Sequence, residues 1–451
     1  MQPIKHVFWG LLVLLTVLWV AAEPQVFAAA TFFALRAAMM QYSGVLAIGC
    51  MSVAMILALR PRWLEPRLGG LDKMYRLHKW LGIAALLIAV VHWLWAQGPR
   101  WAVGFGLLGR PARGARPAVG SQVEQFFMSL RGSAEGIGEW AFYAVVVFIV
   151  LALVQRIPYR LFYKTHRLLA VGYLLLVFHS VVLMSFAYWT TPVGIAMVVL
   201  MAWGTWAAMM ALLRRVGITH QVKGRIVSLQ YYPGVRVLET EIDVPSGWPG
   251  HKAGQFAFAT SDTAEGAHPY TIASAWHEAA HRINFVTKEL GDYTSRLRDT
   301  LRVGQEVKIE GPYGCFTFDD ASPHQIWVGA GIGVTPFIAR MKNLAHLRSE
   351  NASQAGLQTI ELFHPTTDYD EVAERKLMAD AQAANVHLHF LVDARDGRLN
   401  GERIRAAVPA WREASIWFCG PVGFGDALRR DFAEQGFPVS ERFHQELFAM
   451  R

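Results

Sequence analysis

Cysteine and charged residues are both scarce in this sequence. Only 3 of the 451 residues are cysteines, and no two of them form a Cys-x-x-Cys pair. We therefore expect neither a disulfide framework nor a cysteine-based metal site. Charged residues make up 17% of the chain, and no long basic run with interleaved aromatic residues occurs. The pattern therefore gives no reason to expect a nucleic-acid partner.

Long apolar runs are nearly absent after about residue 213. Residues 217–451 have the mixed composition of a globular protein, whereas the first half is strongly apolar. The overall hydrophobic fraction of 53% and the 16 tryptophans are too high for an ordinary soluble enzyme. A length of 451 residues allows two or three domains. The sequence therefore predicts a half embedded in the lipid bilayer, followed by a soluble half.

Six apolar segments are long enough to cross a bilayer as helices, namely residues 7–22, 40–59, 78–96, 139–155, 167–187 and 192–213. The first is expected to be an uncleaved helix, because it is long for a signal peptide. Six spans place both chain ends on one side of the membrane. The basic residues that assign this side to the cytoplasm are Lys5, the loops 60–76 and 155–167, and Arg214 and Arg215. The opposite loop, 98–138, weakens the rule with Arg100, Arg110, Arg113, Arg116 and Arg131.

Histidine is also scarce in the first half, and its positions form two pairs. Apart from His6, the first 215 residues contain only His78, His92, His166 and His179. Fourteen residues of helix rise about 21 Å. The two histidines of one span, His78 with His92 or His166 with His179, would therefore lie near opposite faces of the membrane. Ionisable residues inside a span are costly and indicate function. In this topology His78 and His166 lie near the cytoplasmic face, and His92 and His179 near the outer face. Because neutral imidazole is a standard axial ligand, these two facing pairs would form two bis-histidine haem sites.

Simpler explanations exist for the same residues. A lone histidine in a span is more often a hydrogen-bonded packing residue, and Gly82 and Gly172 suit close helix packing as well as a porphyrin.

A spacing of 14 leaves two side chains about 40° apart around an ideal helix, but the spacing of 13 between His166 and His179 leaves about 140°. The fifth span is therefore tilted or locally irregular, or its two haems approach from different sides.

The soluble half begins with alternating strands, which predict a small antiparallel β-barrel over residues 216–322. Within it, the glycine turn at Gly291 has hydroxyl residues at a helix start. This pattern favours an anion site, although an ordinary loop explains it equally well. From residue 323 to 451, strands alternate with helices, which predicts a parallel α/β sheet. Its first strand leads through a glycine-rich turn into a helix that starts near Pro336, which is typical of a dinucleotide site.

Taken together, these segments resemble the ferric reductase and NADPH oxidase superfamily over essentially the whole chain. The histidine spacings of 14 and 13 match the haem-ligating pairs of that family. HPYTIAS and GDYTSRL resemble the FAD-binding segments of its ferredoxin–NADP reductase-type dehydrogenase, and GPYG, GAGIGVTP and CGP resemble its nicotinamide-nucleotide segments. The resemblance implies a six-helix membrane haem domain (1–215), a β-barrel FAD-binding domain (216–322) and an α/β NAD(P)H-binding domain (323–451).

The resemblance also implies roles for single residues. FAD would be held by His268, Pro269, Tyr270, Thr271, Ser274, Lys288, Gly291, Asp292, Tyr293 and Thr294. The nicotinamide nucleotide would be held by Gly329, Gly331, Gly333, Thr335, Pro336, Gly420 and Pro421. Cys419 and Glu446 would line the hydride-transfer site. Phe448 matches the aromatic residue that the family places against the flavin, although 3 residues follow it in this chain.

The implied function is electron transfer from cytoplasmic NAD(P)H through FAD and two b-type haems to an acceptor outside a bacterial inner membrane. That acceptor would be a ferric complex or dioxygen. Two alternatives remain: transfer to a periplasmic protein, and a non-catalytic haem-handling membrane protein.

Arg36 would hold an anionic acceptor or a propionate, or would simply reach the membrane surface. We expect NADPH rather than NADH, because hydroxyl residues follow the second nucleotide strand, with Arg375 or Arg395 as candidate phosphate ligands. Protein partners are not readable from the sequence.

Overall fold

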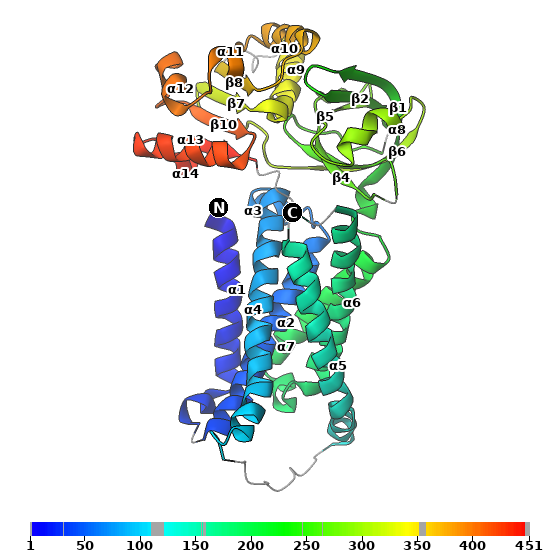
Figure 1. The fold of residues 1–451 in the computed structure, drawn as a ribbon, viewed down its shortest axis with the longest axis vertical. Helices are drawn as coiled ribbons and strands as arrows, with labels where there is room; N and C mark the ends of the chain where they lie inside the picture. Colours follow the sequence, from blue (N-terminus) through cyan, green and yellow to red (C-terminus); the bar gives the residue numbers. More distant parts are fainter. Residues whose placement is uncertain are drawn as a thin grey trace. The chain divides into compact units, whose positions relative to one another are not determined.

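The computed structural model describes residues 2–29, 31–109, 121–154, 156, 159–245, 247–263, 265–350 and 358–446. Within these residues the chain forms two compact units, a helical one up to residue 216 and one built around β-sheets from residue 217 onward. Figure 1 shows both units, coloured along the chain. The finer domain limits at residues 215 and 322 stay a prediction.

The helical unit contains the six predicted spans. They are α1 (Gln2–Ala22), α2 (Phe32–Ala58), α4 (Leu71–Gly104), α5 (Gln122–Leu153), α6 (Tyr159–Leu183) and α7 (Pro192–Leu212). The short elements between them are η1 (Pro24–Ala28), α3 (Glu65–Leu68) and η2 (Phe186–Thr190). Among the described residues, these six helices are the ones long and apolar enough to cross a membrane. The prediction of six spans is therefore confirmed.

The expected loop at residues 98–138 was too long. Helix α4 continues to Gly104 and α5 begins at Gln122, so Arg100 and Arg131 lie in helices. Arg110, Arg113 and Arg116 lie outside the described residues. Apolar content marks where a helix leaves the bilayer rather than where it ends, because polar residues continue a helix in water. The start of α5 also has its own polar support, since the Ser121 hydroxyl accepts a hydrogen bond from the Glu124 amide at 3.1 Å.

The helices pack through small residues and buried hydrogen bonds. Helix α5 runs along α6, and α2 runs along α7. A side chain at Gly172 would collide with Val145 of α5, so this glycine serves close packing of α5 and α6. Between α2 and α6, the Tyr173 hydroxyl lies 2.8 Å from the Ser52 hydroxyl, and both side chains are buried. Such pairs satisfy polar groups that water cannot reach.

The first part of the second unit is a six-stranded antiparallel sheet. Its strands are β1 (Gln221–Tyr232), β2 (Val237–Asp243), β3 (Phe256–Thr260), β4 (His268–Thr271), β5 (Arg282–Lys288) and β6 (Glu306–Tyr313), in the order β4-β3-β6-β1-β2-β5. The helical turns η3 (Ile218–His220), η4 (Thr294–Arg296) and α8 (Leu297–Thr300) lie beside them in sequence. An antiparallel bridge joins Ile272, just after β4, to Phe285 of β5. Full closure into a barrel stays a prediction.

The second part is a parallel α/β sheet, as predicted. Its strands are β7 (His324–Gly329), β8 (Thr359–Thr366), β9 (His387–Val392), β10 (Ser415–Cys419) and β11 (Phe443–Gln445), in the order β11-β10-β7-β8-β9. The helices are η5 (Gly331–Val334), α9 (Thr335–Ser349), α10 (Glu371–Ala384), α11 (Asp393–Asp396), α12 (Gly401–Ala407), α13 (Val422–Glu434) and α14 (Val439–Arg442). Alternating residues of β7 fill two cores, with Trp327 facing α9 and α10 and Ile326 facing α12 and α13.

The core beneath α9 gives a stability prediction. Phe337 is fully buried, and its ring centre lies 5.4 Å from that of Trp327. Phe337→Ala should lower the free energy of unfolding of this unit by about 3–5 kcal/mol, because it leaves a cavity between α9 and β7. Proteolysis of the full-length protein over a urea series should show the loss as a lower midpoint. Met378→Ala, at a side chain that is 48% exposed, is the control. An unchanged midpoint for Phe337→Ala would contradict this packing.

Candidate functional site

The four predicted histidines meet in two pairs between α4 and α6. The ring centres of His78 and His166 lie 5.8 Å apart, and those of His92 and His179 lie 6.3 Å apart. A metal–imidazole bond is about 2 Å long, so two imidazoles on opposite sides of one metal ion have ring centres roughly 6 Å apart. Both observed distances therefore fit a pair of axial ligands on one iron.

Hydrogen bonds to neighbouring helices hold three of these rings by Nδ1. His78 Nδ1 lies 2.8 Å from the Ala54 carbonyl of α2, and His179 Nδ1 lies 2.8 Å from the Ala134 carbonyl of α5. His92 Nδ1 lies 3.0 Å from the Ser43 hydroxyl. A metal-binding imidazole usually donates its other N–H to such an acceptor, which leaves Nε2 for the metal. The side chains therefore fit haem as ligands.

The direction of the hydrogen bond between Ser43 and His92 follows from the other contact of the Ser43 hydroxyl. The Ser43 hydroxyl donates to the Met39 carbonyl at 2.7 Å, so its oxygen can accept from His92 Nδ1–H. The fourth ring differs, because His166 Nδ1 is buried without a hydrogen-bond partner among the described residues. It stacks instead on Phe162, with ring centres 5.0 Å apart.

The 13-residue spacing on α6 does not arise from a local irregularity. Helix α6 is an unbroken α-helix from Tyr159 to Leu183, so that explanation is wrong. On such a helix, His166 and His179 leave the axis on different sides. Of the explanations given above, a tilted span and an approach of the two pairs from different sides remain.

Two glycines that sequence reasoning missed lie against the second pair. A side chain at Gly138 of α5 would overlap the ring of His179, and one at Gly44 of α2 would lie 3.5 Å from His92 Cε1. The local sequence signal for Gly138 is a Gly-x-Gly pattern at residues 136–138, between Glu135 and Glu139 and just before the predicted span 139–155. Gly82 has open space where a side chain would stand, in keeping with room for a flat ligand on α4.

Arg36 has a role other than binding an anion or reaching the membrane surface, the two roles that the sequence suggested. Pro99 lies inside α4 and has no N–H to donate to the Trp95 carbonyl one turn earlier. Arg36 Nε donates to this carbonyl at 2.8 Å, and Arg36 Nη2 donates to the Ala96 carbonyl at 3.3 Å. The guanidinium of α2 therefore replaces a missing helical hydrogen bond of α4 inside the bundle.

In the second unit, the two predicted flavin segments lie together. The rings of His268 and Tyr293 stack with centres 4.2 Å apart and planes 14° apart. The Tyr293 hydroxyl lies 2.6 Å from that of Ser261, which anchors the stack to the end of β3. Burial lowers the pKa of His268, so its imidazole is neutral near pH 7.

The glycine turn before η4 is closed by the hydroxyl of Thr294, the first residue of η4. Thr294 Oγ1 accepts hydrogen bonds from the amides of Leu290 and Gly291 at 3.0 and 3.1 Å. The Asp292 carbonyl accepts from Arg296 Nε at 2.8 Å. The turn is thus held in shape, while a side chain at Gly291 would meet nothing within 4 Å. A preformed turn with open space beside it fits a bound phosphate.

The remaining flavin candidates have different surroundings. Pro269, Tyr270 and Thr271 lie in β4, paired with β3. The Ser274 hydroxyl accepts a hydrogen bond from the Asn284 amide at 3.1 Å, so it is part of the sheet framework. Lys288 Nζ forms an ion pair with Asp368 at 2.6 Å, which joins β5 to the loop after β8. Through that hydrogen bond, Lys288 lowers the pKa of Asp368.

The nucleotide loop and the Cys419 segment also meet. The Ala330 amide donates to the Cys419 carbonyl at 2.9 Å, and a side chain at Gly333 would overlap that carbonyl. Gly331 has a φ of +55°, which favours glycine, and a side chain there would meet nothing within 4 Å, so the backbone is open on this side. Thr335 and Pro336 begin α9, and Gly420 and Pro421 lead from β10 into α13. A glycine-rich turn at a helix start suits a pyrophosphate.

Cys419 and Glu446 lie close enough to influence each other. Cys419 is fully buried, and burial together with the charge of Glu446 raises the pKa of its thiol well above the usual value. The thiol is therefore protonated at neutral pH. The Glu446 amide donates to the Phe418 carbonyl at 3.4 Å, which holds it beside β10. Phe448 lies outside the described residues.

His364 is a buried polar residue that sequence reasoning did not select. Its Nδ1 lies 2.6 Å from the Gly329 carbonyl at the end of β7. Burial lowers the pKa of His364 to about 4, so the ring is neutral and donates this hydrogen bond. It fixes the carbonyl immediately before the glycine turn.

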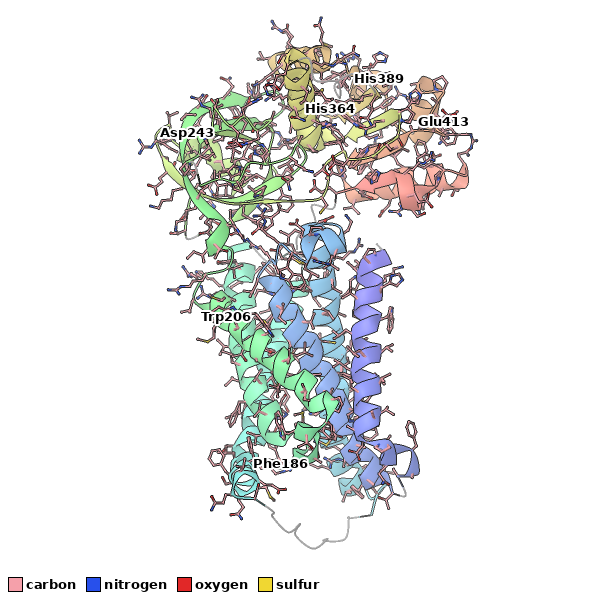
Figure 2. The ribbon with its side chains drawn as sticks, turned by 180° about the vertical axis from the view of Figure 1, so that it is seen from behind. Phe186, Trp206, Asp243, His364, His389 and Glu413 are labelled. Carbon is pink, nitrogen blue, oxygen red and sulfur yellow. The ribbon has the colours of Figure 1, made fainter. Side chains whose placement is uncertain are left out.

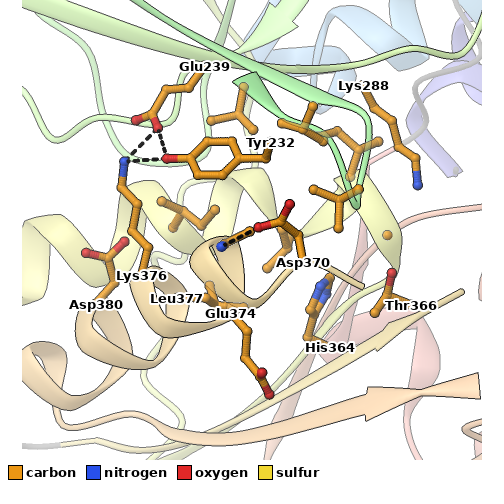
Figure 3. Close-up of a pocket in the computed structure, with 18 of the residues that line it drawn as sticks. Tyr232, Glu239, Lys288, His364, Thr366, Asp370, Glu374, Lys376, Leu377 and Asp380 are labelled. Atoms are coloured by element: carbon orange, nitrogen blue, oxygen red, sulfur yellow. Dashed lines mark hydrogen bonds and ion pairs between the residues drawn. The ribbon is translucent and has the colours of Figure 1, made fainter. Parts of the chain in front are cut away.

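A cavity of about 110 Å³ lies between the two sheets of this unit, beside Gly331 and Thr366 (Figure 3). On its far side, Lys376 of α10 pairs with Glu239 of β2 at 2.6 Å, and the Tyr232 hydroxyl donates to the same carboxylate at 2.9 Å. Burial acts to raise the pKa of Glu239, but these two partners lower it below its usual value. The cluster ties α10 to the antiparallel sheet, and no local pattern indicated it, because its members come from distant segments.

Comparisons with known proteins agree with this arrangement. A family model described as "Ferric reductase like transmembrane component" matches residues 43–177, and one described as "FAD-binding domain" matches residues 221–317. The flavohemoprotein of Deinococcus radiodurans is 25% identical over 185 residues, covering 39% of this chain and 45% of that protein. An NADPH oxidoreductase of Mycobacterium tuberculosis is 26% identical over 191 residues, covering 41% and 47%.

The chain thus spans about half the length of the curated relatives it matches. Among solved structures, the flavohemoglobin of Malassezia yamatoensis has a TM-score of 0.46 and 17% identity, over 95% of this chain and 98% of that one. With a ferric reductase-like transmembrane component followed by an FAD-binding domain, the chain has the architecture of the ferric reductase and NADPH oxidase superfamily.

Proposed function

We propose that this protein is a transmembrane oxidoreductase that moves electrons from cytoplasmic NAD(P)H, through FAD and two b-type haems, to an acceptor outside the membrane. The observation that carries the proposal is the pair of histidine contacts between α4 and α6, with ring centres 5.8 and 6.3 Å apart. Their arrangement at two levels of one helix pair, 14 residues apart on α4 and 13 on α6, supports a path across the bilayer. The soluble unit and both chain ends would then lie in the cytoplasm, and the membrane would be a bacterial inner membrane.

Each residue set has a defined task in this proposal. When bound, the nicotinamide supplies a hydride, FAD accepts it as an electron pair, and haem accepts single electrons. His78 and His166 would hold one haem, and His92 and His179 the other. The stacked His268 and Tyr293, with the turn at Gly291, would hold FAD within the predicted barrel.

The hydride-transfer region would be formed by the C-terminal segments. Cys419 is a neutral, buried thiol, which would exclude water beside the reacting rings without adding charge. Gly331 would let the pyrophosphate approach the backbone at the start of α9. Phe448 is proposed to cover the flavin, as in the family.

The structure favours NADH over the NADPH that the sequence suggested. Both arginines considered as ligands for a 2′-phosphate pair with carboxylates, Arg375 with Glu371 and Arg395 with Asp396, each at 3.1 Å. The Thr366 hydroxyl donates to the Asp368 carbonyl at 2.9 Å. A doubly charged phosphate beside β8 would therefore compete with carboxylates for these arginines, whereas a ribose hydroxyl can donate to a carboxylate.

The outer acceptor is proposed to be a ferric complex or dioxygen. Bis-histidine ligation uses both axial positions of each iron, so the acceptor would take electrons at the haem edge. Arg36 donates to two carbonyls of α4, which argues against a free guanidinium waiting for an anionic acceptor. Superoxide and ferrous iron should be assayed separately with the same purified protein.

The haem assignment predicts a loss of one haem of two. His92→Ala should lower the haem content of the purified protein by about half while FAD binding is kept, because the second axial ligand pair is broken. His6→Ala, an exposed histidine on α1, is the matched control and should retain both haems. Haem and flavin are quantified by absorbance after extraction. Full haem content in His92→Ala would contradict the assignment of His92 as a haem ligand.

The proposed path predicts an ordered reduction. Anaerobic addition of NADH to the purified protein should bleach the flavin absorption first and then shift the haem bands to their reduced positions. In His78→Ala the flavin should still bleach, while haem reduction slows or stops. If flavin bleaches in the wild type and the haem bands stay oxidised, the protein is not a transmembrane electron carrier.

The charges near β8 predict the nucleotide preference. The kcat/KM for NADH should exceed that for NADPH by about tenfold, which corresponds to about 1.4 kcal/mol. Glu371→Gln should narrow this ratio, because it releases Arg375 for a phosphate. Glu350→Gln, in the ion pair of α9 with His346, should leave the ratio unchanged. A wild-type preference for NADPH would overturn the proposed charge effect.

A further inference from the structure

A cluster of three metal-ligating side chains lies on strands β8 and β9 of the α/β sheet, and none of the three belongs to the proposed flavin, nucleotide or haem residues. His387 and His389 are two residues apart on β9, so their side chains share one face of the sheet. Glu361 lies opposite His387 in the parallel pairing of β8 and β9. The three side chains therefore emerge side by side from two neighbouring strands.

The polar atoms of this cluster converge on one point. His387 Nδ1 and His389 Nε2 each lie 2.7 Å from the same Glu361 oxygen, Oε2. The three candidate ligand atoms all lie within 4.8 Å of one another. Two imidazoles satisfy a single carboxylate oxygen in this way only if both carry a proton there. A divalent cation would replace both protons and accept all three lone pairs.

The surroundings hold the ligands in place and leave the site accessible. His389 stacks on Phe363 of β8, with ring centres 4.3 Å apart and planes 4° apart, which fixes the imidazole. The side chains of His389 and Glu361 are 24% and 17% exposed, while that of His387 is 69% exposed. Strand β9 is the edge of the sheet, so an ion can reach the cluster from solvent. Figure 2 shows His389 within this unit.

The cluster is separate from the nucleotide site. His387 begins β9, and Glu361 and His389 lie in the first half of their strands. The glycine turn and Cys419 lie at or just after the opposite, carboxyl ends of β7 and β10, where α/β sheets bind nucleotides. A ligand at the histidine cluster would thus not compete with NAD(P)H.

We propose that Glu361, His387 and His389 form a binding site for a late first-row divalent metal ion of the Zn²⁺ class. Two imidazole nitrogens and one carboxylate oxygen, with a remaining position for water, form a donor set that Zn²⁺ accepts in tetrahedral geometry. Imidazole donors select this class over Ca²⁺ and Mg²⁺, which prefer oxygen ligands. The bound ion cross-links the edge strand β9 to β8 and stabilises the sheet.

The test is a Zn²⁺ titration of the tag-free holoprotein in detergent, after treatment with a chelator, read by competition with a chromophoric chelator. Wild-type protein should bind one Zn²⁺ per chain. His387→Ala and Glu361→Gln should each weaken binding by at least about tenfold, since even outer-shell changes cost this much. Because His387 is exposed, its replacement should leave the fold and the FAD content intact. Zn²⁺ should raise the thermal unfolding temperature of the wild type and not of the variants.

His346→Ala is the matched control. His346 lies next to His277, with ring centres 4.1 Å apart, and pairs with Glu350, so it offers a competing histidine cluster in the same unit. This variant should bind Zn²⁺ as the wild type does. Loss of binding in His346→Ala with retention in His387→Ala, or no Zn²⁺ bound by the wild type, would overturn the proposed site.

Discussion

The helical unit depends on how imidazoles are held inside an apolar bundle. Three of the four have a partner for Nδ1, whereas His166 Nδ1 has none among the described residues. Polar atoms in a membrane must find partners within the protein, because the lipid offers none. The Nδ1 atoms of His78 and His179 find them in carbonyls of α2 and α5, and that of His92 finds the Ser43 hydroxyl of α2. Helices α2 and α5, which carry none of these four histidines, therefore orient three of the rings on α4 and α6. The same requirement explains Arg36, which satisfies the carbonyl that Pro99 leaves unpaired.

The second unit meets a different constraint, because segments from distant parts of the chain are held together across its two sheets. Ion pairs and close backbone contacts serve this purpose. Lys288 and Asp368 join the antiparallel sheet to the loop after β8, and Lys376 joins α10 to Glu239. Gly333 lets the glycine turn press against the Cys419 carbonyl, where any side chain would collide. The hydrogen bond of neutral His364 to Gly329 holds the same turn from the other side.

Local sequence patterns were sufficient to predict much of the fold. The six spans follow from apolar length, and the parallel sheet follows from strands alternating with helices. The errors were also local in origin. The loop at 98–138 was overestimated, because hydropathy marks the bilayer boundary while the helices continue beyond it to Gly104 and from Gln122. For Gly172 the sequence left close helix packing and space for a porphyrin open, and the contact with Val145 decides for packing. A glycine in a helix looks the same in sequence whether it faces a ligand or a neighbouring helix.

The sequence by itself determined the number of spans, the scarcity of histidine within them, and the order of the flavin and nucleotide motifs. These properties depend on composition and on short spacings that one segment carries alone. The six-span topology also predicted which imidazoles face each other, as the two ring pairs confirm. Only the tertiary structure decided which carbonyls and which hydroxyl hold them, and that Arg36 supports α4. It also brought Glu361 beside His387 and His389, and it paired Arg375 and Arg395 with carboxylates. Such contacts depend on the register between segments tens of residues apart, which packing of the whole chain sets and no local pattern records.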